Sequence, residues 1–184
     1  MIDTVLDTVT DTLTDEELER DAEPVETTTR KTIILFSGEF DKVVAAFVIA
    51  NGAAAMDDEV TMFFTFWSIN ALRRPEKVAI SGKTALQKAF SLMMPRGPGK
   101  LATSHMNFAG AGPKLMKRMM REQKVMSLDD LIASAREQGV KMVVCQMSMD
   151  VMGLKAEELV DGLEFAGVAS YLSDADDANV NLFI

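Results

Sequence analysis

One residue of this chain has the chemistry of a strong nucleophile: Cys145, the only cysteine, within the segment VVCQMSMDVMG at residues 143–153. The thiolate, rather than the thiol, is the reactive form, and a helix N-terminus stabilises it. The apolar run at 140–145 predicts a strand that ends at Cys145, and a short helical segment is expected to follow it. In open α/β sheets, ligands bind at the carboxyl ends of the strands. Cys145 is therefore our first candidate for a catalytic residue.

Polar residues follow the thiol closely in the sequence: Gln146, Ser148 and Asp150. Ser148 is expected to cap the helix, because a serine oxygen accepts hydrogen bonds from unpaired backbone N–H groups. Asp150 would place a negative charge near the positive end of the same helix, and Gly153 would end it. The opposite interpretation is that Cys145 packs as a small apolar residue, since free cysteine is among the most buried residue types. The position alone leaves both interpretations open.

A second set of candidates follows the first predicted strand, residues 32–36. Ser37 and Gly38 stand between that strand and a predicted helix at 39–56. They should therefore lie on the same sheet edge as Cys145. The segment resembles a phosphate-binding loop only faintly, since the chain has no GxxxxGK[ST] motif. We treat Ser37 and Gly38 as candidate pocket residues.

His105 is the only histidine. It could act as a general base for Cys145, although the sequence does not give the distance between the two side chains. One histidine and one cysteine, without a CxxC pair or a carboxylate cluster, do not make a metal site. We predict neither a metal nor an organic cofactor.

The chain has 14 methionines. Met142, in the strand that leads to Cys145, is expected in the core. Another set lies in the irregular region of the chain and in the helix after it: Met93, Met94, Met106, Met116, Met119 and Met120. Flexible thioether side chains can repack against different partners. These methionines either fill the core or form a soft interaction surface.

Strands and helices alternate along the chain, which predicts a three-layer α/β domain with a mainly parallel sheet. The expected strands are residues 32–36, 59–67, 140–145, 163–165 and 180–184. The expected helices are residues 39–56, 84–94, 113–122, 130–138, 155–162 and 167–178. Residues 68–112 form an irregular, partly helical excursion, which is long for a connection between a strand and a helix. Such excursions are commonly functional or interfacial.

Length and charge describe one globular domain with an acidic extension. The chain has 184 residues and a net charge of −9, which argues against a nucleic-acid partner. Much of the acid lies in residues 1–30, which we predict to be an acidic tail, partly helical or mobile. The folded domain is expected at 31–184. A docking helix for a neighbouring subunit is an alternative role for the tail.

The cysteine content and the apolar segments indicate the compartment. One cysteine cannot form an internal disulfide, which fits a reducing cytoplasm. The first residues lack the basic leader and apolar run of a signal peptide. The longest apolar stretch, residues 43–56, is shorter than the roughly 20 residues that span a bilayer. We expect a cytoplasmic protein without a membrane span.

Several segments resemble the DsrE/DsrF-like family. They are KLATSHMNFAGAGPKLMKRMM, SLDDLIASAREQGVKMVVCQMSMDVMG and the closing GLEFAGVASYLSDADDANVNLFI. The opening KTIILFSGEFDK and the later FTFWSINALRR agree as well. The resemblance covers about residues 30–184 and is closest to the subgroup whose cysteine lies in a CQMSMDVMG segment.

The resemblance implies a three-layer αβα sandwich with a five-stranded parallel sheet, in homo-oligomers such as trimers or hexamers. It implies that the thiolate of Cys145 accepts sulfane sulfur as a persulfide and passes it to another protein's cysteine. The implied partners are rhodanese-like and TusA-like sulfur-carrier proteins. Asn107, Gly110 and Gly112 match the family's loop before a helix and are expected to line the pocket. Gln146 also matches, without an assigned role, and so does Ser148.

We therefore predict a sulfur-relay protein, or sulfurtransferase, that uses Cys145. The alternative is a non-enzymatic, oligomeric binding or scaffold module with a Met-rich surface, in contact with a membrane surface through Leu72 to Met94. A flavin or nucleotide protein of the flavodoxin type is disfavoured, because no phosphate loop rich in Ser, Thr and Gly follows Phe36. A peroxidase is disfavoured as well, because the chain has no resolving cysteine.

Overall fold

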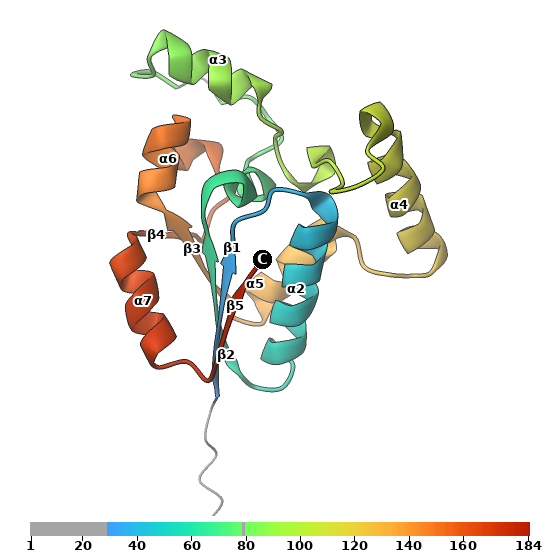
Figure 1. Ribbon diagram of the computed structural model, residues 1–184, viewed down its shortest axis with the longest axis vertical. Coiled ribbons are helices and arrows are strands. Elements are labelled where there is room, and N and C mark those ends of the chain that lie inside the picture. Colours follow the sequence, from blue (N-terminus) through green and yellow to red (C-terminus); the bar gives the residue numbers. More distant parts are fainter. Residues whose placement is uncertain (1–28, 79) are drawn as a thin grey trace, which may run out of the picture.

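A five-stranded sheet forms the centre of the computed structural model, which describes residues 29–78 and 80–184 (Figure 1). All its neighbouring strands run parallel, in the order β4-β3-β2-β1-β5. The strands are β1 Arg30–Leu35, β2 Glu59–Phe64, β3 Lys141–Cys145, β4 Glu164–Ala166 and β5 Val180–Phe183. The predicted parallel sheet is confirmed. Residues 1–28 of the predicted acidic tail, with the predicted helical segment, lie outside the described residues. The last two residues of the predicted tail are described, and Arg30 is the first residue of β1.

One face of the sheet carries the larger core. Helices α2 (Phe40–Ala54) and α5 (Leu128–Glu137) pack side by side on this face (Figure 1). The small residues of α2 let the helix approach the sheet closely, and Ala46, Ala50 and Ala53 are buried there. The predicted helix at 39–56 is confirmed, although it ends at Ala54, two residues earlier than predicted.

The other face has a thinner cover, provided mainly by the nine-residue helix α7 (Val168–Asp176) (Figure 1). Tyr171 anchors this helix, because its ring is buried and its hydroxyl lies 3.2 Å from the hydroxyl of Thr32 on β1. Lys141 of β3 donates to Asp174 of α7 at 3.1 Å, and this contact raises the pKa of Lys141. The fold is thus a sandwich whose two outer layers differ in thickness.

The connection after β2 departs from the prediction. A strand was expected over residues 59–67, but β2 ends at Phe64 and a 3₁₀ helix, η1, occupies Phe66–Leu72. The cause is local: the hydroxyl of Ser68 accepts from the backbone N–H of Thr65 at 3.0 Å and donates to its carbonyl at 2.9 Å. These bonds turn the chain away from the sheet although its residues are still apolar.

The excursion contains two longer helices, α3 (Ala85–Met93) and α4 (Ala111–Glu122), with short 3₁₀ turns η2 (Pro98–Lys100) and η3 (Phe108–Gly110) between them. Thr84 begins α3 with a capping box, and Ser127 begins α5 in the same way. Helix α4 starts at Ala111 rather than at Pro113. No described helix is both long and apolar enough to cross a membrane.

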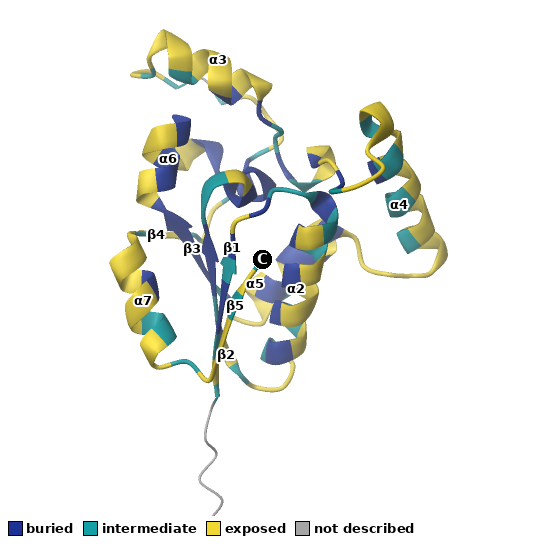
Figure 2. Cartoon of the chain, viewed as in Figure 1, coloured by how far each residue is buried: buried dark blue, intermediate teal, exposed yellow. Residues whose placement is uncertain are grey.

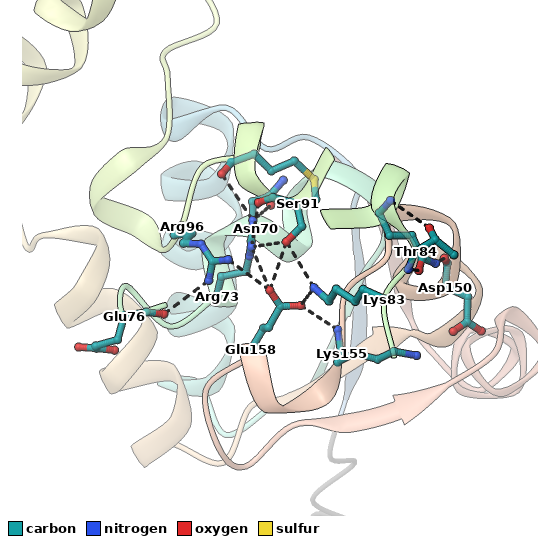
Figure 3. A network of polar contacts seen from close by, with 12 residues as sticks. Asn70, Arg73, Glu76, Lys83, Thr84, Ser91, Arg96, Asp150, Lys155 and Glu158 are labelled. Atoms are coloured by element: carbon teal, nitrogen blue, oxygen red, sulfur yellow. Dashed lines mark hydrogen bonds and ion pairs between the residues drawn. The ribbon is translucent and has the colours of Figure 1, made fainter. Parts of the chain in front are cut away.

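A buried cluster of charges ties the excursion to the rest of the domain (Figure 3). The carboxylate of Glu158, 1% exposed, lies 3.2 Å from the Arg73 guanidinium and 3.4 Å from that of Arg96, and it also pairs with Lys83. The predicted helix at 155–162 is wrong: only the 3₁₀ turn η4 (Ala156–Glu158) forms. This turn directs Glu158 inward to the three cations, and the bridge between Leu159 and Arg73 follows it.

The electrostatics of this cluster favour the ionised carboxylate. Burial works to raise the pKa of Glu158, but the bonds from Lys83 and from the Lys155 N–H, together with the charge of Arg73, more than offset it. The pKa of Glu158 therefore lies below its usual value. A lowered pKa in the folded state stabilises the fold above the unfolded carboxyl pKa of about 4.3 and loses that effect as the pH falls further.

A Glu158→Gln substitution tests this cluster. It leaves three cations around a neutral amide, and we expect a loss of about 3–5 kcal/mol in the free energy of unfolding at pH 7. Denaturant unfolding measures the loss, and the stability of the variant should depend less on pH between about 5 and 3 than that of the wild type. Asp161→Asn is the matched control, since Asp161 pairs with Arg74 at the surface and should change stability by less than about 1 kcal/mol. Equal losses in the two variants would contradict the assignment.

Candidate functional site

Cys145 is the last residue of β3 and the residue that caps helix α6 (Gln146–Met152). The predicted strand end is therefore confirmed, and the helix begins one residue after the thiol. Gly153, with φ of 66°, ends α6 as expected. The backbone N–H groups of the first turn of α6 are at the same end of the helix as Cys145.

The side chain of Cys145 belongs to the thinly covered face of the sheet. It is 3% exposed and packs in a small cluster with Phe63, Val143 and Tyr171 (Figure 2 shows the buried strand ends). Met142 and Val144, the alternate residues of β3, belong to the larger core on the other face. The thiol thus lies in an apolar enclosure, roofed by the single helix α7.

The neighbours of Cys145 have other roles than predicted. Ser148 does not cap α6: it is fully buried, and its hydroxyl lies 2.8 Å from the hydroxyl of Thr65, at the end of β2. Asp150 is exposed and lies beyond the first turn of α6, so it does not complement the start of the helix. Both corrections have one cause, because α6 starts at Gln146 rather than at residue 149. Gln146 itself is exposed.

Ser37 and Gly38 follow β1 on the same sheet edge, as predicted, and β2 lies between β1 and β3. They line a cleft of about 530 Å³ together with Phe36, Trp67, Asn70, Pro95 and Phe183. A Cβ on Gly38 would stand 2.6 Å from the carbonyl oxygen of Trp67, so only glycine permits this approach. The Ser37 hydroxyl donates to Glu39 at 2.9 Å. Bonds from Lys42 and Ser37 lower the pKa of Glu39.

His105 and the glycines of the next loop lie elsewhere. His105 and Gly112 line a cleft of about 450 Å³ with apolar residues of α4, namely Leu115, Met116 and Met119. The carbonyl of Asn107 accepts from the N–H of Gly110 at 2.8 Å and of Gly112 at 3.2 Å, which forms the predicted loop before α4. Gly110 adopts φ of 92° and caps the helix.

An aspartate of α2 shares this second cleft. Asp41 accepts from the backbone N–H of Ser104 at 2.8 Å. Burial works to raise the pKa of Asp41, but the bonds from Ser104 outweigh it, and the pKa lies below its usual value. Because the cleft is formed by α2, α4 and the loop between them, it lies on the side of the sheet opposite to α7 (Figure 1). The structure therefore does not bring His105 to Cys145.

The sequence-predicted residues thus fall into two groups. Cys145, Ser37 and Gly38 share the carboxyl edge of the sheet, whereas His105, Asn107, Gly110 and Gly112 form a separate region at α4. Sequence reasoning missed Tyr171 and Phe63, which enclose the thiol. The alternation along β3 was the available signal, since it places Val143 and Cys145 on one face.

Fold and site together define a class of protein: a parallel α/β sandwich that carries a single cysteine in an apolar enclosure at the carboxyl edge of its sheet. The chain belongs to the DsrE/DsrF/DrsH-like family, whose model matches residues 27–183. The recognised family resemblance is confirmed, and the assignment to a subgroup by the cysteine segment stays a prediction.

Two relatives and one solved structure are informative. The uncharacterized protein YrkE of Bacillus subtilis (strain 168) is 55% identical over 159 residues, which cover 86% of this chain and 99% of YrkE. The sulfur carrier protein DsrE2 of Allochromatium vinosum is 31% identical over 83% of this chain and 96% of its own. The crystal structure of the ychN protein from E. coli superposes with a TM-score of 0.50 at 12% identity, over 85% of this chain and 99% of that one. It shows a shared fold.

The enclosure of Cys145 generates a prediction about reactivity. Truncation of Tyr171 to Ala removes the largest side chain that α7 contributes to the cluster around Cys145, together with the contact with Thr32. We expect alkylation of Cys145 by iodoacetamide to accelerate at least about tenfold. The rate is measured by intact mass against time. Leu172→Ala is the matched control, since Leu172 is on the same helix and 52% exposed; it should leave the rate unchanged. A wild-type thiol that reacts as fast as free cysteine would contradict the enclosure.

Proposed function

We propose that this protein is a sulfur-relay protein, which accepts sulfane sulfur as a persulfide on Cys145 and passes it to a thiol of another protein. One observation carries the proposal: the only cysteine of the chain stands at the carboxyl end of β3 and at the start of α6. Family membership supports it, because a relative over most of the chain is a sulfur carrier protein.

The chemistry needs one thiolate and no other reagent. The Cys145 thiolate attacks the terminal sulfur of a donor persulfide, R–S–SH. A new S–S bond forms on Cys145, the donor's S–S bond breaks, and the donor leaves as its thiolate. An acceptor thiolate then attacks the terminal sulfur in the same way and releases the Cys145 thiolate. The sulfane sulfur keeps its oxidation state throughout, so electrons balance without an oxidant or a reductant.

The enclosure suits a carried intermediate. A persulfide surrounded by Phe63, Val143 and Tyr171 is shielded from other thiols. Because the thiol is 3% exposed, both transfer steps require a local opening near α7 or α6. Helix α7 has few contacts with the sheet and exposes Val168 and Leu172, which marks it as the less stable cover.

Each of the two steps needs a partner protein, one that donates a persulfide and one that offers a thiol. We propose a rhodanese-like sulfurtransferase as donor and a TusA-like carrier as acceptor, in the cytoplasm. The exposed side chains of Val168, Leu172 and Phe183 form apolar surface near the thinly covered face. This surface supports the proposal of a homo-oligomer, a trimer or a hexamer, because isolated domains rarely leave such patches in water.

The loading step is the direct test of the function. The purified protein is incubated with thiosulfate and a catalytic amount of a rhodanese, and its intact mass is measured. We expect a gain of one sulfur atom per chain, mapped to Cys145, and its removal by cyanide or dithiothreitol. The Cys145→Ser variant is the control and should gain nothing. A wild-type protein that stays unmodified under these conditions would contradict the proposal.

A binding or scaffold module is the second candidate. The observation in its favour is the exposed apolar surface of the excursion, where Leu86, Leu92 and Met93 of α3 and Met106 and Met119 around α4 face solvent. The buried Met94, Met142, Met149 and Met152 instead fill the core. Two results together would favour this candidate. The wild-type protein would take up no sulfur, and a Cys145→Ala variant would still bind every partner of the wild type.

A further inference from the structure

Charge is divided unequally between the two parts of the chain. Residues 29–184 carry 18 acidic and 18 basic side chains, whereas residues 1–28 carry ten acidic side chains and one arginine, Arg20. The net charge of −9 therefore belongs entirely to residues 1–28. The family model begins its match at residue 27, so this acidic segment is an addition to the family domain.

The opposite charge is concentrated on helix α4. Lys114, Lys117, Arg118 and Arg121 occur within its 12 residues, against the single acid Glu122. Arg118 pairs with Glu122 at 2.8 Å. Among residues 29–78 and 80–184, no carboxylate lies within ion-pair distance of Lys114 or Arg121. Helix α4 also stands away from the sheet, next to α2 and α5 (Figure 1).

A cleft runs along this helix. It has a volume of about 510 Å³, and its lining is apolar and, on balance, basic. The apolar lining residues are Phe40, Met120, Val125 and Leu128. The charged ones are Lys114, Lys117 and Arg121 against the single acid Asp129, and Ser127 completes the lining. Lys117 is partly satisfied, since it donates to the carbonyl of Gly99 at 2.8 Å and lies 4.9 Å from the ring centre of Phe40. The cleft thus fits an occupant that is apolar on one side and acidic on the other.

Residues 1–28 have this composition. Val5, Val9 and Leu13 recur every four residues, which gives one apolar stripe at helical spacing. Asp3, Asp7 and Asp11 recur with the same period, each two positions before one of these apolar residues. At helical spacing, an offset of two residues corresponds to the side opposite the apolar stripe. We propose that this segment docks in cis on α4, with the apolar stripe in the cleft and carboxylates near Lys114 and Arg121.

The connection is long enough for this contact. The segment joins β1 at the amino edge of the sheet, whereas Phe40 lies beyond its carboxyl edge, about 20 Å away along a six-residue strand. Residues 19–28 can span roughly 33 Å when extended. A tether of this length holds the segment at an effective concentration of order 1 mM, so even weak docking is populated.

Hydrogen exchange of the full chain tests the proposal. A Val9→Asp and Leu13→Asp double variant should raise the exchange rates of α4 amides several-fold, and so should 1 M salt, because charges are screened within about 3 Å there. The matched control is Thr4→Asp with Thr14→Asp, which adds the same charge off the apolar stripe and should leave α4 unchanged. Exchange in α3 (Ala85–Met93) should not respond in any variant.

Cross-linking identifies the occupant. A carbodiimide should join carboxylates of residues 1–28 to Lys114 or Lys117, and an equal mixture of ¹⁴N- and ¹⁵N-labelled protein should show these links within single chains. Three outcomes would overturn the proposal: α4 exchange that is equal in the wild type and the Val9/Leu13 variant, no cross-link to α4, or links between copies only. The sulfur-loading assay on the same variants should be unaffected by their loss of docking, which separates this proposal from the proposed function.

Discussion

The burial of Glu158 between three cations is the interaction on which the arrangement of the carboxyl edge depends. Arg73 and Glu158 lie 85 positions apart, and the Arg73 guanidinium also donates to Ser91 and to the carbonyl of Pro95. These bonds hold Arg73, Ser91 and Pro95 of the excursion together and join them to Glu158 (Figure 3). Trp67 and Pro95, which line the cleft at Ser37, are thereby fixed over the strand ends.

The two outer layers of the sandwich are unequal. Helices α2 and α5 form a broad core on one face, and the other face keeps only α7 over the enclosure of Cys145. A fully buried nucleophile beneath a firm layer would be inert. A thiol beneath one short helix can instead be shielded at rest and reached after a local opening. This balance between protection and access is what a carried persulfide requires.

The alternation of strands and helices predicts the parallel sheet, and the apolar run before Cys145 predicts the strand end on which the site depends. The turn after Phe64 could not be predicted from apolar content, because side-chain bonds of Ser68 override a continued strand. The pairing of Arg73 with Glu158 could not be predicted either, because the sequence does not show whether a charged side chain is buried or lies at the surface. For the same reason, the distance of His105 from Cys145 is visible only in three dimensions.

Onward transfer of sulfur from the loaded protein shows whether Cys145 is a relay site. The wild-type protein is loaded with radiolabelled sulfane sulfur, freed of donor, and mixed with a TusA-like carrier whose thiol is reduced. We expect the label to leave Cys145 and to appear as a persulfide on the carrier, about one sulfur per chain, whereas a Cys145→Ser protein should deliver none. Label that stays on the loaded protein, or that reaches the carrier equally from the Cys145→Ser variant, would rule out a sulfur relay through Cys145.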